Sequence, residues 1–180
     1  MKSKILMLFV FFSVSFYAQE KYYTKSGTIT FESSVPSFEE VKATNTKVTA
    51  ILKDDGTIAS LALTKAFRFK IALMEEHFNE NYMESSSFPK ATFSGKIVNF
   101  TMDQLRPNEK EFRIKGTLTI RGISKNIELK SQIKRQENSI SITSNFTAIP
   151  EDFGIKIPKI VRNKIAKKVD ITFNFILKKK

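Results

Sequence analysis

The feature that most constrains the fold of this chain is an alternation of apolar and polar residues with a period of two. Between residues 112 and 120 every second residue is apolar or small, and the residues between them are polar or charged. The pattern returns at 127–134, 140–148 and 169–177. It is typical of strands with one buried and one solvent-facing side. Because parallel strands covered on both sides would be apolar throughout, we expect antiparallel strands.

Turn-forming residues predict where these and further strands begin and end. Asp54-Asp55-Gly56 is the strongest hairpin signal, since Asp-Gly accepts the positive φ of a tight turn. Short polar turns are also expected at 121–125 and 136–139, and Gly116 is expected to mark a bend or bulge within its strand. The additional strands are expected at 26–33, 47–52, 57–64 and 91–102. About eight strands result, enough to close a barrel without exposed edges.

One stretch has helical spacing instead. Ile71, Met74, Phe78 and Tyr82 recur at intervals of three and four, with polar residues between them. This spacing predicts an amphipathic helix of about 13 residues at 71–83. A second, weaker helical turn is expected at 158–166, where a proline could occupy the first turn. The predicted fold class is therefore all-β, an eight-stranded antiparallel barrel with one inserted amphipathic helix.

The N-terminus has the pattern of an export signal. Lys2 and Lys4 precede an apolar run at 5–16, and Ala18 supplies a small residue near a cleavage point. A membrane anchor is the alternative, but the run is shorter than the roughly 20 residues that a spanning helix needs. We therefore expect a signal peptide at 1–19 and one barrel domain at 20–180, in the periplasm or secreted.

The chain has no cysteine and is strongly basic. The absence of cysteine excludes disulfides, thiolate metal sites and a lipid-modified anchor cysteine. The formal net charge is +12. Since an exported protein rarely meets nucleic acid, an anionic membrane surface or lipid head group is the better partner, and a merely solubilising surface is the alternative. We name as the basic patch six residues expected to meet such a surface: Lys156, Lys159, Arg162, Lys164, Lys167 and Lys168.

Residues suited to catalysis are sparse. His77 is the only histidine, and neither a Gly-x-Ser-x-Gly elbow nor further zinc ligands accompany it. The simpler interpretation is that His77 flanks the helix and is hydrogen-bonded to a loop, rather than acting as a catalytic base. Glu75 and Glu76 are adjacent on the predicted helix, so they point apart and make a poor acid–base pair. We expect no enzymatic activity, no metal and no cofactor, and a hydrolase that uses His77 is the least favoured hypothesis.

The chain has 17 phenylalanines and no tryptophan. An eight-stranded barrel is about the size at which the interior is either filled by side chains or holds one ligand. A strand of nine residues spans about 30 Å, so a lumen along it would suit an extended chain. Composition alone does not decide between a filled and a hollow interior.

Three stretches resemble a known family. The sequence HFNENYME at 77–84, followed by FPKATF at 88–93, resembles the central signature of the YceI-like family. KGTLTIRGISK at 115–125 looks like a hairpin of that family, and 146–155, which contains Asp152-Phe153-Gly154, is similar to its final stretch. Together these motifs extend the resemblance over roughly 27–177.

The resemblance implies a lipocalin-like barrel of eight antiparallel strands, exported to the periplasm. It also implies binding of polyisoprenoid or other long-chain lipids in an elongated apolar tunnel, without enzymatic activity. The chain departs from the family at its start, where residues 22–27 stand in place of the expected first strand. One mouth of the tunnel is therefore expected to differ.

We accordingly predict an exported protein that holds a long apolar chain of the polyisoprenoid or fatty-acyl type. The predicted helix would cover one end of the barrel as a lid. The predicted ligand contacts are Phe67, Phe69, Met74, Phe78, Tyr82, Leu118, Ile120, Phe146, Phe173 and Phe175. The alternative is a solid-cored barrel that acts as an interaction or stress-related module without a ligand.

Overall fold

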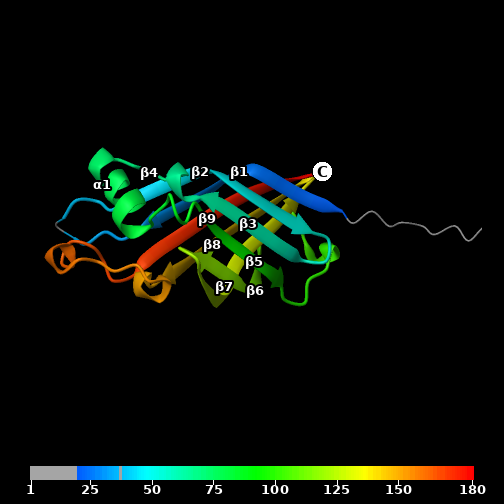
Figure 1. The fold of residues 1–180 in the computed structure, drawn as a ribbon. Coiled ribbons are helices and arrows are strands. Elements are labelled where there is room, and N and C mark those ends of the chain that lie inside the picture. Colours follow the sequence, from blue (N-terminus) through cyan, green and yellow to red (C-terminus); the bar gives the residue numbers. More distant parts are fainter. Residues whose placement is uncertain (1–19, 37) are drawn as a thin grey trace, which may run out of the picture.

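Eight long strands close into an antiparallel barrel (Figure 1). The computed structural model describes residues 20–36 and 38–180, and the predicted signal peptide at 1–19 lies outside the described residues. The strands are β1 Lys21–Glu32, β2 Lys42–Lys53, β3 Thr57–Leu63, β5 Lys90–Ile97, β6 Lys110–Ile120, β7 Ile123–Gln136, β8 Ser139–Ala148 and β9 Val169–Lys179. They follow the order β1-β9-β8-β7-β6-β5-β3-β2, and pairing of β1 with β2 closes the barrel. The predicted fold class is confirmed.

The first strand is longer than the sequence pattern indicates. Residues 22–27 are not a replacement for a strand but the first part of β1, which pairs with both β2 and β9. Register shifts between Thr24 and Ile29 mark an irregularity at which the alternation of inward- and outward-facing residues shifts by one position. At this point Gly27 packs closely against a ring, because a Cβ on it would lie 2.6 Å from Phe175. The phase change explains why a strict period of two misses the strand's beginning.

Gly116 has a different role from the bend or bulge expected there. It lies opposite Gly95 in a regular β5–β6 ladder. A Cβ on Gly116 would lie 2.5 Å from the Ser94 carbonyl oxygen and 2.6 Å from the Phe93 ring. The ring therefore packs over this glycine pair, as aromatic side chains do on strand glycines.

A short helix covers one end of the barrel, where a helix was predicted at 71–83. It consists of α1 (Ala72–His77) and a π-helical turn, η2 (Phe78–Tyr82). The two-residue strand β4 (Arg68–Phe69) pairs with β2 and leads into it. The Glu75 carboxylate accepts hydrogen bonds from the Arg68 guanidinium at 2.8 Å and the Phe69 N–H at 3.2 Å, which ties α1 to β4.

The remaining helical elements are single 3₁₀ turns. They are η1 Thr64–Ala66, η3 Met102–Gln104, η4 Pro150–Phe153 and η5 Lys159–Val161. The turn expected at 158–166 is thus reduced to η5. None of the helices in residues 20–36 and 38–180 has the length and apolar character needed to cross a membrane.

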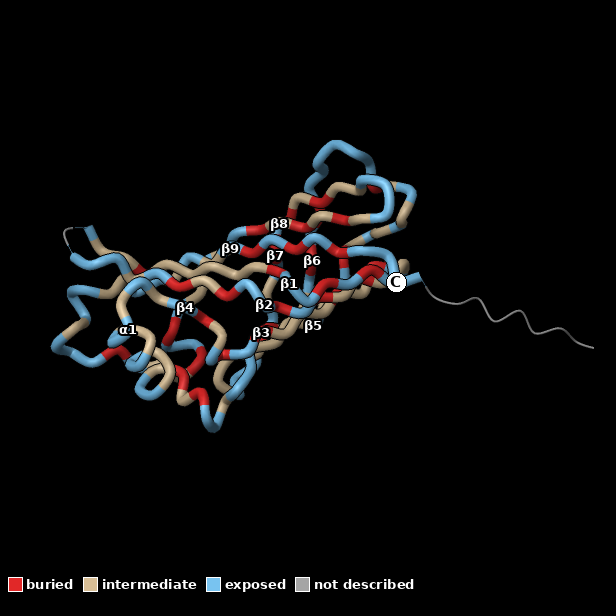
Figure 2. Tube along the Cα trace, turned by 90° about the horizontal axis from the view of Figure 1, so that it is seen from above, coloured by how far each residue is buried: buried red, intermediate tan, exposed pale blue. Residues whose placement is uncertain are grey.

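The packed core fills the end of the barrel where the C-terminus lies, opposite α1 (Figure 1). Figure 2 shows buried positions alternating with exposed ones along the strands near this end. The large core side chains that are fully buried and lie outside the cavity wall include Tyr22, Leu52, Ile97, Ile133, Ile140, Ile142 and Leu177. Antiparallel pairing brings the start of β1 and β8 beside the end of β2, β7 and β9, so that residues far apart in sequence form one core.

Candidate functional site

The end of the barrel near α1 is hollow. It encloses a cavity of about 650 Å³, within the range usual for small-molecule sites. Every barrel strand except β2 contributes to its wall, and so do α1, η2, η4 and η5. The wall is almost entirely aliphatic and aromatic. The barrel is therefore filled by side chains at one end and hollow at the opposite end, and neither description fits its whole length.

The cavity is blind because the packed core closes its inner end. Ile58 and Ile114 belong both to the cavity wall and to the core. The rings of Phe173 and Phe175 stack with their centroids 4.8 Å apart and also line the wall. Leu177, the next inward-facing residue of β9, is fully buried in the core and lies outside the wall. A chain that entered from the α1 end would stop here.

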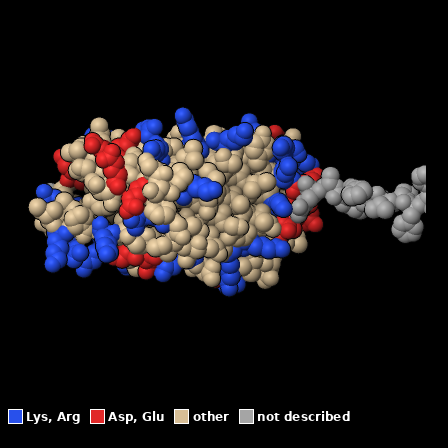
Figure 3. Space-filling view, viewed as in Figure 1, with Lys and Arg blue, Asp and Glu red and all other residues tan. Residues whose placement is uncertain are grey.

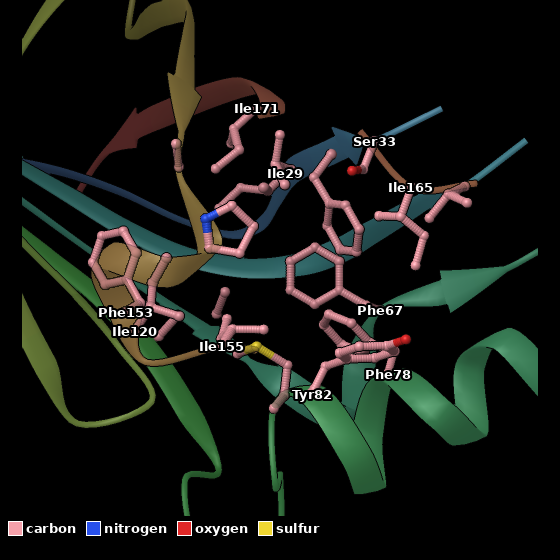
Figure 4. Close-up of a pocket in the computed structure, with 18 of the residues that line it drawn as sticks. Ile29, Ser33, Phe67, Phe78, Tyr82, Ile120, Phe153, Ile155, Ile165 and Ile171 are labelled. Atoms are coloured by element: carbon pink, nitrogen blue, oxygen red, sulfur yellow. The ribbon is translucent and has the colours of Figure 1, made fainter. Parts of the chain in front are cut away.

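Four phenylalanines form a cluster beneath α1: Phe31, Phe67, Phe69 and Phe78. Phe78, at the start of η2, lies 5.3 Å from Phe31, 5.8 Å from Phe67 and 5.2 Å from Phe69 between ring centroids. Aromatic pairs at such separations contribute roughly 0.5–1.5 kcal/mol beyond burial. Figure 4 shows Phe67, Phe78 and Tyr82 together on one side of the cavity. The cluster holds the helix over the cavity.

Polar groups on the wall are few. Ser33 donates its hydroxyl hydrogen to the Ala166 carbonyl at 3.0 Å, so its polar group has a partner within the protein. Burial raises the pKa of the Tyr82 phenol, whose hydroxyl can donate a hydrogen bond. Among the described residues, Lys164 is the only lysine or arginine on the wall. These groups offer a polar head group limited contacts near the cavity's outer end.

The two sides of the mouth carry opposite charge. Figure 3 shows acidic side chains over the α1 side and basic ones below them at the same end of the molecule. Glu75, Glu76 and Glu80 lie on α1 and η2. All six residues of the basic patch are exposed, and within the described part of the chain none forms an ion pair with a carboxylate. The basic side is thus available for an anionic partner.

The three resembling stretches meet beside the cavity. Arg121, in the β6–β7 turn, donates to the Gly154 carbonyl at 2.8 Å and pairs with the Glu84 carboxylate. Its guanidinium lies 5.5 Å from the centre of the Phe88 ring. Phe153, next to Gly154, is buried and lines the cavity. Arg121 therefore holds η4 against the barrel and keeps Phe153 in the wall.

All ten side chains predicted to contact a ligand lie in the cavity wall. That they hold a ligand stays a prediction. Sequence reasoning did not name the wall residues that come from the segments between the long strands, because most of these segments have no strand or helical period. Among them are Phe38, Pro150, Phe153, Ile155 and Ile157, and also Val161, Lys164 and Ile165, which lie in the helical turn expected at 158–166.

His77 is exposed at the end of α1 and lies at the edge of the cavity. In residues 20–36 and 38–180 there is no group of three or more histidine or acidic side chains that could hold a metal ion.

Comparison with known proteins agrees with this architecture. A family model described as YceI-like domain matches residues 13–177. A polyisoprenoid-binding domain from Saccharophagus degradans, implicated in plant cell wall breakdown, has a TM-score of 0.79 at 12% identity, covering 91% of this chain and 100% of that chain. Burkholderia cenocepacia BcnA has a TM-score of 0.68 at 13% identity, covering 83% and 95%.

A Campylobacter jejuni YCEI protein has a TM-score of 0.53 at 17% identity, covering 100% of this chain and 99% of that chain. No curated protein sequence matches the chain. At these identities, the likeness to solved structures shows a shared fold.

Proposed function

Since the chain belongs to the YceI-like domain family, we propose that it is a non-enzymatic carrier that holds a long apolar chain in its barrel. The observation that carries this proposal is the blind cavity with an apolar wall. The polyisoprenoid-binding domain of Saccharophagus degradans, which has the same fold, supports a ligand of the polyisoprenoid or fatty-acyl type. The ligand enters tail first, because the cavity lies at the α1 end and the packed core closes its inner end.

Apolar contact alone supplies the affinity. Each methylene moved out of water contributes about 0.8 kcal/mol, so ten of them contribute about 8 kcal/mol. Part of this gain offsets the lost freedom of the bound chain. Lys164 and Tyr82 lie where a polar head group would remain, near the outer end of the cavity.

Native mass spectrometry of protein purified from its own host tests the proposal. We expect a co-purifying lipid that organic solvent removes, and rebinding of a fatty acid or an isoprenoid alcohol by the emptied protein. A clean apo mass together with no binding of either added chain overturns the proposal. It would favour the alternative of an interaction module without a ligand, which the cavity itself counts against.

A matched pair of variants tests where the chain binds. Ala62 is buried and lines the cavity. Ala59, on the same strand β3, faces the other side of the sheet and is outside the wall. Ala62→Phe should fill space in the cavity and weaken chain binding at least tenfold, while Ala59→Phe should leave it unchanged. Equal effects of the two variants would contradict binding in the cavity.

We also propose that residues 1–19 are a cleaved signal that directs export. The charged start and the apolar run at 5–16 support this. N-terminal sequencing of protein from its host should find the mature chain beginning at residue 19 or 20. Full-length protein confined to the cytoplasm would refute export.

The basic patch is proposed to meet an anionic membrane surface. Its six exposed cations beside the mouth support this, and their attraction should weaken as salt rises. Unchanged liposome binding after all six are neutralised would show that the patch is only solubilising.

A further inference from the structure

Ile160 is the most exposed large apolar side chain among the described residues, with 85% of its surface in solvent. It lies in η5, within the basic patch and directly between Lys159 and Val161. Val161 lines the cavity. An isoleucine presented in this way, amid cations, has the chemistry of an element that enters a bilayer interface.

A shallow hollow of about 490 Å³ lies beside η5. Three cations of the basic patch line it, Arg162, Lys167 and Lys168, and Glu151 lies at it as well. The apolar part of the hollow is formed by Ile149, Ile157 and Ile165. A hollow lined by both cations and apolar side chains has groups that can contact the phosphate and the first methylenes of an anionic lipid.

The hollow and the main cavity share a wall. Ile157 and Ile165 line both of them, so one layer of side chains separates the hollow from the proposed carrier site. A membrane bound at the hollow would therefore lie next to the mouth through which a chain must pass.

The opposite rim differs in charge. Leu73 on α1 is 56% exposed and lines the cavity, and the exposed carboxylates of Glu76 and Glu80 lie on α1 and η2. An anionic surface would repel these carboxylates. The charge distribution therefore favours approach by the η5 side alone.

We propose that residues 156–168 form a membrane-insertion element, in which Ile160 enters an anionic bilayer while Arg162, Lys167 and Lys168 bind lipid phosphates at the hollow. The molecule docks tilted, with the η5 side down and α1 raised, and the cavity opens beside the lipid. This inference rests on the proposed carrier function and adds to it the surface at which a chain is exchanged.

The absence of native tryptophan allows a direct test. Three single-tryptophan variants are compared: Ile160→Trp, Leu73→Trp on the acidic rim, and Ile176→Trp on β9, an exposed control at 56%. With vesicles of phosphatidylcholine and phosphatidylglycerol, only Ile160→Trp should shift its emission to the blue and become shielded from iodide. No shift at 160, or an equal shift at 73 or 176, overturns one-sided insertion.

Binding measurements separate this inference from the carrier function. Ile160→Asp should weaken vesicle binding at least about tenfold, and Arg162→Gln or Lys167→Gln about fivefold each. Pure phosphatidylcholine vesicles should bind no variant. None of the three substitutions should change binding of a fatty acid in solution without vesicles. If the unsubstituted protein does not bind the fatty acid in solution, the carrier function is refuted. If it binds the fatty acid but residue 160 does not insert into vesicles, only the membrane-insertion element is refuted.

Discussion

Replacing Arg121 by alanine should destabilise the protein by about 2–3 kcal/mol. The side chain is 22% exposed, and its loss removes the hydrogen bond to the Gly154 carbonyl and the ion pair with Glu84. A hydrogen bond from a charged donor contributes about 1.5 kcal/mol, a partly exposed ion pair about 0.5 kcal/mol, and the guanidinium over Phe88 about 0.5–1 kcal/mol. The sum lies within the stated range.

Urea unfolding followed by circular dichroism measures this loss. Arg113→Ala is the matched control, because its 3.5 Å ion pair with Glu128 lies on the barrel's outside and should contribute under about 0.5 kcal/mol. Hydrogen exchange should also increase at Gly154 in the Arg121 variant, since η4 loses its tie to the β6–β7 turn. Equal stability of the two variants, or unchanged exchange at Gly154, would refute the role of Arg121 in holding η4.

Four further changes have defined outcomes. Phe78→Ala should cost about 2 kcal/mol in unfolding free energy, about half the usual loss for a fully buried phenylalanine, and should speed release of a bound chain in stopped-flow measurements. Gly116→Ala should cost about 1–3 kcal/mol in thermal unfolding, because its Cβ would lie 2.5 Å from a carbonyl oxygen. Hydrogen bonds from the Thr57 N–H and hydroxyl lower the pKa of Asp55 in the folded protein. Their contribution to stability is therefore present above the pKa of the unfolded state and is lost as the pH falls through the lower pKa of the folded state. Asp55→Asn should accordingly reduce the fall in melting temperature between pH 7 and acid pH. His77→Ala should leave the melting temperature and chain binding unchanged, and a hydrolytic activity lost with it would instead support an enzyme.

Several local features are determined by short stretches of sequence. The alternation along β6 to β9 predicts antiparallel strands because each residue's side is set by its place in the strand. Asp55-Gly56 predicts the β2–β3 turn, where Gly56 has a φ of +82°. The spacing of three and four predicts the helix at α1 and η2. Each signal acts over a few residues, so it can be read without knowing the rest of the chain.

Features that depend on a partner strand are not readable in this way. The β1 irregularity shifts the inward-facing phase, so the pattern hides the strand's start. Gly116 looks like a bulge until Gly95 and the Phe93 ring are placed against it. The Arg121 guanidinium likewise donates to the Gly154 carbonyl only because η4 folds back onto the β6–β7 turn.

The division of the interior into a cavity and a core is decided by the tertiary structure alone. Phe173, Phe175 and Leu177 are inward-facing and apolar at equal spacing on β9, yet the first two line the cavity and Leu177 lies in the core. The alternation along β9 already predicts that these side chains point inward. Whether they meet other side chains or open space depends on what the opposing strands and η4 bring to the same level of the barrel, and that is a property of the closed fold.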